Sequence, residues 1–220
     1  MPAFSLGRTQ ELIYMLHKLV DQKDIPALPI SIDSPLAKNI TRVFQGYTAD
    51  FDEEFWKDFG EKGEKAFLFD NLITTSSIQE SQSINDKEGS LIVIAGSGMC
   101  EGGRILHHLK NNIENPNSTI LITGYQGEYT LGRKILEGVS PVKIFGQDYQ
   151  VKAKVVVLNE LSAHADQKDL LTYVRHVKGL ENLFLVHTEM SEAAAFKAIV
   201  QETYPALKVE IPAMGQEFDI

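Results

Sequence analysis

The chain has 220 residues, of which 43% are hydrophobic and 23% charged, enough for one large domain or two small ones. Its net charge of −9 argues against broad electrostatic binding of nucleic acid, unless local basic clusters or bound cations supply positive charge. The single cysteine, Cys100, excludes an internal disulfide and a zinc site made of cysteines alone. Because the sequence has neither a membrane-spanning run nor a signal-peptide pattern, we expect a cytoplasmic protein.

The first half of the chain predicts helices that alternate with strands. Apolar residues at helical spacing predict a helix over 9–22 with Thr9 as its N-cap. Ser34 and Pro35 are typical of a helix start and follow a predicted strand. The remaining elements expected here are a strand over 28–33, helices over 36–47, 52–59 and 76–85, and a strand over 90–96.

The second half continues the same alternation, with one interruption at 139–158, where two β-rich runs predict a hairpin or meander. Asp166 is the expected N-cap of a further helix. Helices are otherwise expected over 104–113, 130–136 and 191–204, strands over 118–124 and 182–187, and one strand followed by a loop over 207–220. This order is typical of an α/β fold with a parallel sheet covered by helices, in which ligands bind at the carboxyl ends of the strands.

Two histidines follow two successive predicted strands. His164 lies in "SAHAD" after one strand, and His187 lies in "VHTE" at the end of the next. If these strands are parallel neighbours, about 4.8 Å apart, both imidazoles can converge on one centre, where Asp166 or Glu189 can orient a ring. Imidazole is a common metal ligand and a common general acid or base. The alternative is that each histidine only hydrogen-bonds its own loop.

Two glycine-rich loops, "AGSGMCEGG" and "TGYQGEYTLG", each lead from a strand into a helix. Backbone amides at such a turn can bind a phosphate, with Arg104 and Arg133 nearby, although a plain structural turn explains the glycines equally well. His107 and His108 are expected at the surface or in packing. In "DSPLAKN", Asp33 and Lys38 could serve a ligand, but capping by Ser34 explains most of the motif. Cys100 has no identifiable base partner, so a catalytic cysteine is set aside.

Several motifs occur together in one order: "GRTQELIYML", "IDSPLAKNITRVF", the two glycine loops, "LSAHADQKDLL" and "LVHTE". Together they resemble the β-CASP branch of the metallo-β-lactamase superfamily, zinc-dependent nucleases that act on RNA or DNA, and the prokaryotic RNA-acting members most of all. The resemblance covers nearly the whole chain and is strongest over 90–190. It implies a Rossmann-like β-CASP domain over 1–158, with its α/β core at about 8–145, and over 159–220 the C-terminal part of a metallo-β-lactamase domain.

The resemblance also implies roles for particular residues. His164, with Asp166 beside it, matches a catalytic histidine near the scissile phosphate, a candidate general acid. His187 matches a zinc ligand, although this chain has Thr188 where the family usually has glycine. In a complete family member two zinc ions activate the attacking water. The residues implied to line the RNA path are Ser97, Gly98, Arg104, Gly127, Thr130, Arg133 and Ser162.

The family's His-x-His-x-Asp-His motif is not found in this sequence. We therefore expect the chain to be part of a zinc-dependent ribonuclease, inactive alone, which needs the other half of the catalytic domain from the same gene or a partner chain. A non-catalytic RNA-binding or scaffold module is the alternative. An unrelated doubly wound nucleotide-binding domain fits less well, because the glycine spacing fails the dinucleotide fingerprint. We expect RNA as a partner and no contact with a membrane. The sequence leaves open whether the chain forms a homodimer, whether DNA is a substrate, and whether the action is endo- or exonucleolytic.

Overall fold

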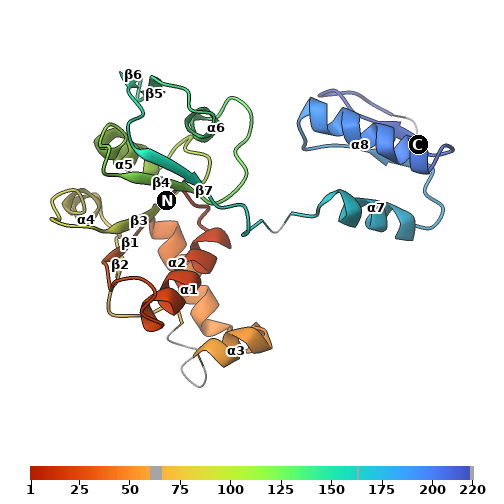
Figure 1. Ribbon diagram of the computed structural model, residues 1–220. Coiled ribbons are helices and arrows are strands. Elements are labelled where there is room, and N and C mark those ends of the chain that lie inside the picture. The colour runs from red at the N-terminus through yellow and green to blue at the C-terminus, as the bar shows by residue number, and fades with distance from the viewer. Residues whose placement is uncertain (60–65, 163, 219–220) are drawn as a thin grey trace. The chain divides into compact units, whose positions relative to one another are not determined.

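A computed structural model describes residues 1–59, 66–162 and 164–218, and the chain divides into two compact units, Met1–Ser162 and Ala163–Ile220 (Figure 1). The helices of the first unit are α1 (Arg8–Asp21), α2 (Pro35–Gly46), the 3-10 turn η1 (Thr48–Asp50), α3 (Glu53–Phe59), α4 (Ile78–Ser83), α5 (Ile105–Asn112) and α6 (Leu131–Leu136). Its strands are β1 (Ile30–Asp33), β2 (Leu72–Thr74), β3 (Ile92–Ala95), β4 (Thr119–Ile122), β5 (Val142–Ile144), β6 (Gln147–Tyr149) and β7 (Lys154–Val157). The second unit contains α7 (Gln167–His176), β8 (Asn182–Phe184), α8 (Met190–Thr203) and β9 (Lys208–Glu210).

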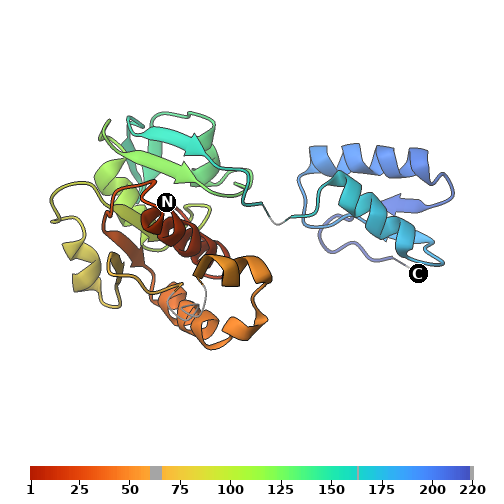
Figure 2. The same cartoon turned by 60° about the horizontal axis from the view of Figure 1, so that its bottom comes forward.

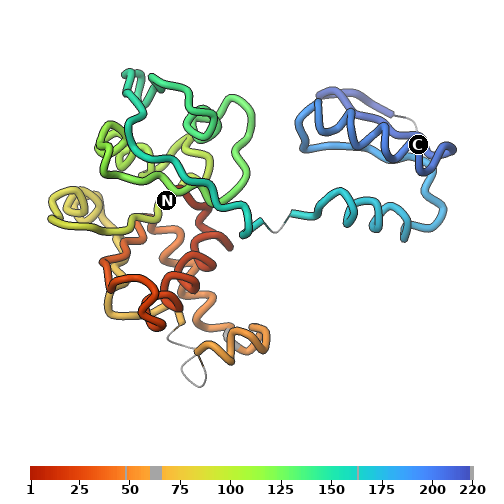
Figure 3. Tube along the Cα trace, in the orientation of Figure 1, coloured from red at the N-terminus to blue at the C-terminus, as the bar shows by residue number. Residues whose placement is uncertain are grey.

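The first sheet is parallel and has the order β2-β1-β3. Its central strand β1 is buried along its whole length, as expected for a parallel strand covered on both faces. The N-terminal segment joins this sheet beyond β3, where Pro2 forms a parallel bridge with Ala95 (Figure 3). Asp33 is paired with Ala95 at the carboxyl ends of β1 and β3, so the segments that follow these strands leave the sheet at one edge.

A second parallel pair joins β4 to β7, and a short antiparallel hairpin joins β5 to β6. The predicted hairpin over 139–158 is therefore only partly right. Residues 142–149 form it, whereas 154–157 leave it to pair with β4, since Val155 of β7 packs against the apolar cluster around β4.

Most predicted helix starts are confirmed, and one is wrong. The Ser34 hydroxyl accepts the amide of Ala37, and Ser77, Thr130 and Asp166 likewise cap their helices. Thr9 is not a cap, because α1 begins at Arg8 after Gly7, and the buried Thr9 hydroxyl donates to the carbonyl of Phe4 at 2.7 Å. Burial makes this bond to the preceding segment more favourable than capping in solvent.

Each unit has its own core, and Figure 2 shows the helices around the strands. In the first unit, one cluster fills the space among β4, α5, α6 and the hairpin. An aromatic-rich cluster lies between α1, α2 and α3. The second unit packs α7 and α8 on β8 and β9 through Val174, Val200, Leu207 and Val209. The predicted α/β class with parallel strands and covering helices is confirmed.

Within the described residues, no helix is both long enough and apolar enough to span a bilayer.

Candidate functional site

The two glycine loops meet at the carboxyl ends of β3 and β4. The Gln126 side-chain amide donates to the carbonyl of Gly98 at 3.0 Å, and the amide of Gly132 donates to the carbonyl of Met99 at 3.0 Å. The Glu101 carboxylate accepts the amide of Leu131 at 2.5 Å. The structure thus brings together loops 96–103 and 124–131, which are separated in sequence by α5 and β4.

Loop 96–103 is held largely by its own hydrogen bonds. The Ser97 hydroxyl accepts the amides of Glu101 and Gly102, and the Ser97 amide donates to the carbonyl of Gly102. Gly103 has φ +76°, and a Cβ there would lie 2.5 Å from the carbonyl oxygen of Gly96, so glycine is required. These contacts favour the structural-turn interpretation for part of the loop, and RNA contacts by Ser97 and Gly98 stay predictions.

Loop 124–131 is organised by Thr130. Its hydroxyl donates to the carbonyl of Gly127 at 2.7 Å and accepts the amide of Arg133 at 3.2 Å, which closes the turn and starts α6. Arg133 forms an ion pair with Glu137 at 2.5 Å and donates to the carbonyl of Gln126 at 3.3 Å. Arg133 therefore stabilises the loop. The predicted roles of Gly127, Thr130 and Arg133 in binding RNA stay predictions.

A buried polar network lies beside loop 96–103. Asp33 is fully buried at the end of β1; its Oδ1 lies 2.7 Å from a guanidinium nitrogen of Arg104, and its Oδ2 lies 2.7 Å from Nε2 of His108. Thr75 and Ser81 donate to the same carboxylate. Burial opposes ionisation, but the hydrogen bonds from His108, Ser81, Thr75 and Arg104 outweigh it and hold the pKa of the Asp33 carboxyl well below its usual range.

The sequence does not predict this network. Its patterns indicate Asp33 only as a possible ligand, Arg104 as a phosphate contact and His108 as a surface or packing residue. The available signal was the spacing of Arg104 and His108, four residues apart and so on one face of α5. Arg104 forms an ion pair with the buried carboxylate of Asp33 here. A contact between Arg104 and RNA would compete with this ion pair. No sequence pattern predicts the role of Gln126, which is buried and links the two glycine loops.

Cys100 has the environment of a structural thiol. It is fully buried, and burial raises the pKa of its thiol to about 12. An attacking thiolate would need the opposite shift.

The two predicted catalytic histidines lie at the amino ends of helices in the second unit. His164 is exposed and precedes Asp166, whose carboxylate accepts the amide of Asp169 at 2.9 Å in a capping box that starts α7. Asp166 therefore has a structural task, and its predicted catalytic role stays a prediction. Ser162 ends the first unit, and Ala163, between Ser162 and His164, lies outside the described residues.

His187 lies in the turn between β8 and α8, where it is exposed and has φ +59°. Few residues other than glycine adopt this left-handed conformation, which histidine tolerates better than most, and such conformations often mark functional sites. The hydroxyl of Thr188 donates to the carbonyl of Glu189 at 3.3 Å. The turn therefore accommodates threonine at the position after the histidine.

The predicted reason for bringing the histidines together is wrong. The strand before His164 is β7, which pairs with β4, and the strand before His187 is β8, which pairs with β9. They belong to different sheets in different units, so they are not parallel neighbours. Each strand instead pairs with the partner that completes the apolar core of its own unit.

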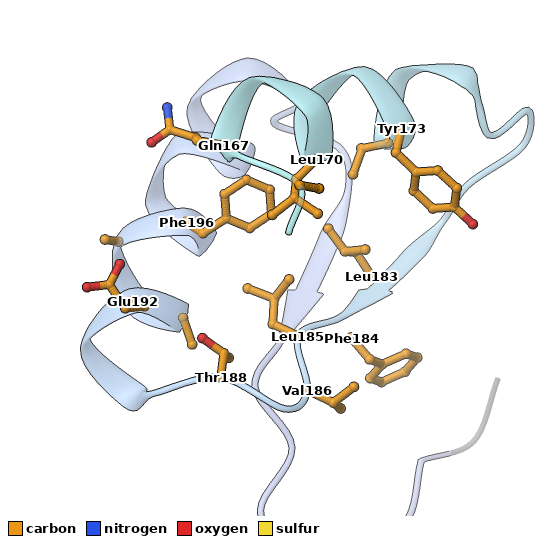
Figure 4. Close-up of a pocket in the computed structure, with 14 residues that line it drawn as sticks. Gln167, Leu170, Tyr173, Leu183, Phe184, Leu185, Val186, Thr188, Glu192 and Phe196 are labelled. Carbon is orange, nitrogen blue, oxygen red and sulfur yellow. The ribbon is translucent and has the colours of Figure 1, made fainter. Parts of the chain in front are cut away.

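An apolar groove of about 500 Å³ lies between α7, α8 and β8 (Figure 4). Leu170 of α7, Leu183 of β8 and Phe196 of α8 line it. Thr188 and Ala165, each next to one of the two histidines, also line the groove. The groove thus runs between the two turns that carry the histidines.

Among the residues described, no group of three or more histidine, cysteine, aspartate or glutamate side chains is arranged to hold a metal ion. A catalytic zinc needs about three protein ligands. The described residues therefore do not fit a complete zinc site, and His187 can contribute at most a single ligand.

Comparison with known proteins gives one family match in each half of the chain. Residues 9–135 match the Beta-Casp domain family, and residues 148–212 match the family described as the Zn-dependent metallo-hydrolase RNA specificity domain.

Three curated relatives have different names: a ribonuclease, a transcription termination factor and an RNase J-like protein. A ribonuclease of Thermus thermophilus is 33% identical over 89% of this chain and 44% of its own length. A transcription termination factor, FttA, of Methanosarcina mazei is 26% identical over 97% of this chain and 34% of its own length. An RNase J-like protein of Methanocaldococcus jannaschii is 27% identical over 92% of this chain and 46% of its own length.

The chain thus spans less than half the length of each of these relatives. The Beta-Casp match covers more than half of the present chain and includes both glycine loops. The chain therefore belongs to the β-CASP family of the metallo-β-lactamase superfamily.

Proposed function

We propose that this chain supplies the RNA-binding β-CASP domain, residues 1–158, and a C-terminal catalytic segment, residues 159–220, of a zinc-dependent ribonuclease that hydrolyses RNA phosphodiester bonds. The observation that carries the proposal is the match of residues 148–212 to a zinc-dependent metallo-hydrolase RNA specificity domain, because this stretch contains both His164 and His187. The relative from Thermus thermophilus, itself called a ribonuclease, supports the same activity.

In this proposal His164 is the general acid that protonates the leaving oxygen of the RNA. The capping box of Asp166 and Asp169 supports this role, because it fixes the backbone two residues after His164. Exposure of His164 agrees with contact to a macromolecular substrate. Proton transfer by a positioned side chain typically contributes about 10²–10⁴-fold to a rate.

His187 is the proposed metal ligand, supported by its exposed position and its left-handed backbone in the turn after β8. Since a lone imidazole cannot hold a catalytic zinc, the other ligands in this proposal come from residues outside these 220. The isolated chain is then expected to bind RNA without cutting it. A non-catalytic RNA-binding module is the second candidate, and relatives called transcription termination factors rather than nucleases favour keeping it.

A chimera tests the two candidates directly. The 195 matched residues of the Thermus thermophilus ribonuclease would be replaced by this chain, and cleavage of a labelled single-stranded RNA would be followed. We expect cleavage, and a loss of about 100-fold or more on His164→Ala or His187→Ala. The matched control is His176→Ala, an exposed histidine at the end of α7, which should leave the rate unchanged.

Three results separate the candidates. A folded chimera that binds RNA but does not cut it would favour the non-catalytic module. Cleavage that survives both histidine substitutions would contradict the proposed catalytic roles while leaving the ribonuclease assignment in place. A chimera that melts cooperatively but binds no RNA would contradict both candidates.

A further inference from the structure

We propose that Phe4, Tyr125 and Tyr129 form an aromatic edge on which bases of single-stranded RNA stack. In this proposal, stacking rather than charge supplies most of the affinity of the first unit for RNA. The inference rests on the proposed function for the identity of the ligand. It adds the chemistry by which the ligand is held and a set of residues outside the two histidine turns.

The three aromatic residues lie around the meeting point of the glycine loops. Ala3 donates to the carbonyl of Ala95 at 3.0 Å, so Phe4 leaves the sheet at the carboxyl end of β3. The Phe4 ring packs on Gly98, where an added Cβ would lie 2.8 Å from Cδ2 of the ring. The carbonyl of the same Gly98 accepts the side-chain amide of Gln126, which places Tyr125 on the adjoining loop.

Packing and backbone geometry do not explain why Tyr129 is a tyrosine. Its side chain is 86% exposed, and its φ of +67° is one that glycine would adopt at lower cost. Phe4 and Tyr125 are each 51% exposed. Exposed rings beside the glycine loops offer flat apolar faces with little side-chain entropy to lose, as base-stacking platforms do.

The arginines near this edge are already paired with carboxylates. Three arginines have a guanidinium nitrogen close to a carboxylate oxygen. The distances are 2.7 Å for Arg104 and Asp33, 2.5 Å for Arg133 and Glu137, and 2.6 Å for Arg8 and Glu11. The chain as a whole carries a net charge of −9. Attraction to phosphates is therefore weak here, whereas stacking on aromatic rings does not depend on charge and contributes strongly for each base bound.

The test compares two labelled probes binding to the 220-residue chain by fluorescence anisotropy: an oligouridine and an abasic ribose-phosphate oligomer of equal length. We expect the oligouridine to bind about tenfold more tightly, with a shallow dependence on salt. Tyr129→Ala should remove most of this preference, and Tyr129→Phe should keep it. Tyr129 is the first choice because its exposed side chain can be truncated without opening the core.

The matched control is Tyr47→Ala, another exposed tyrosine of the same unit at the far end of α2 from Ser34. It should leave both affinities unchanged. Because Phe4 packs on Gly98, Phe4→Leu is used there to retain apolar volume, with the melting temperature as a check, and we expect a severalfold loss for oligouridine alone.

Equal binding of the two probes, or an unchanged preference in Tyr129→Ala, would overturn the stacking proposal and leave RNA binding in place. Binding of neither probe would instead contradict the proposed function. A steep loss of oligouridine binding with added salt would identify phosphate contacts as the main source of affinity and would also overturn the proposal.

Discussion

Asp33 shows how a single residue can join three segments of this chain. Its carboxylate ends β1 and accepts from Thr75 and Ser81 on the segment after β2. It also pairs with Arg104, the N-cap residue of α5, and with His108 on α5. An ion buried in this way is stable only when its hydrogen bonds are complete. Since α5 follows loop 96–103 directly, the network also holds that loop against the sheet.

Asp33→Asn is therefore expected to lower the free energy of unfolding by about 3 kcal/mol at neutral pH, because Arg104 would lose its buried partner. Since the folded pKa of Asp33 lies below the unfolded value of about 3.9, this stabilisation is complete above that value and is lost as pH falls through the folded pKa. Urea denaturation of both proteins should give a constant difference above about pH 5 that shrinks at lower pH.

The control is Asp148→Asn on the exposed strand β6, which should change stability by less than about 0.5 kcal/mol. A difference for Asp33→Asn that is equally small would contradict the buried network.

Neighbouring glycines in loop 96–103 provide a second test on individual residues. Gly103→Ala places a Cβ 2.5 Å from the carbonyl oxygen of Gly96 at a φ of +76°, so we expect a loss of about 2 kcal/mol in unfolding free energy. At Gly102 a Cβ meets nothing within 4 Å, so Gly102→Ala is the matched control. Equal melting temperatures for the two variants would contradict the close approach at Gly103.

Among the secondary-structure elements, α7 connects packing to the proposed chemistry. Its capping box places Asp166 and Asp169 at the amino end, next to His164, and its apolar residues Leu171 and Val174 pack into the core of the second unit. The helix therefore holds the backbone near His164 through interactions that need no ligand.

Asp166→Ala is expected to cost about 1 kcal/mol, because the amide of Asp169 loses its acceptor. Asp166→Ser retains a capping oxygen and should recover most of that loss. Thermal melting followed by circular dichroism measures both. A serine variant as unstable as the alanine variant would show that the carboxylate does more than cap the helix.

In the molecule as a whole, the two units differ in how they are stabilised. Within the described residues, the first unit has several apolar clusters, and the second has one cluster, built from α7, α8, β8 and β9. Because the described part of the chain contains no group of three suitable side chains, neither unit holds a complete metal site there.

Purified chain is therefore expected to retain well under one zinc ion per molecule after dialysis, measured by inductively coupled plasma mass spectrometry. The content should not change in His187→Ala, because a single imidazole binds zinc weakly. Tightly held, stoichiometric zinc in the unmodified chain would contradict this expectation.

Much of the fold could be predicted from local patterns. Ser34-Pro35, Thr130 and Asp166 start helices where they were expected, because capping depends on a few adjacent residues. The failures involve partners distant in sequence. Thr9 bonds to Phe4 instead of capping α1, and β7 joins β4 instead of the hairpin, because in both cases burial against another segment outweighed the local preference.

The same distinction applies to the candidate site. The order of motifs was enough to assign the β-CASP family, and the polar residues after the strands marked the glycine loops and both histidine turns, because these signals lie in short continuous stretches. Sequence could not show that Asp33 joins Arg104 and His108, that Gln126 links the two loops, or that β7 and β8 belong to different sheets. Those features depend on which distant segments pack together, and packing is set by the burial of many side chains at once rather than by any local pattern.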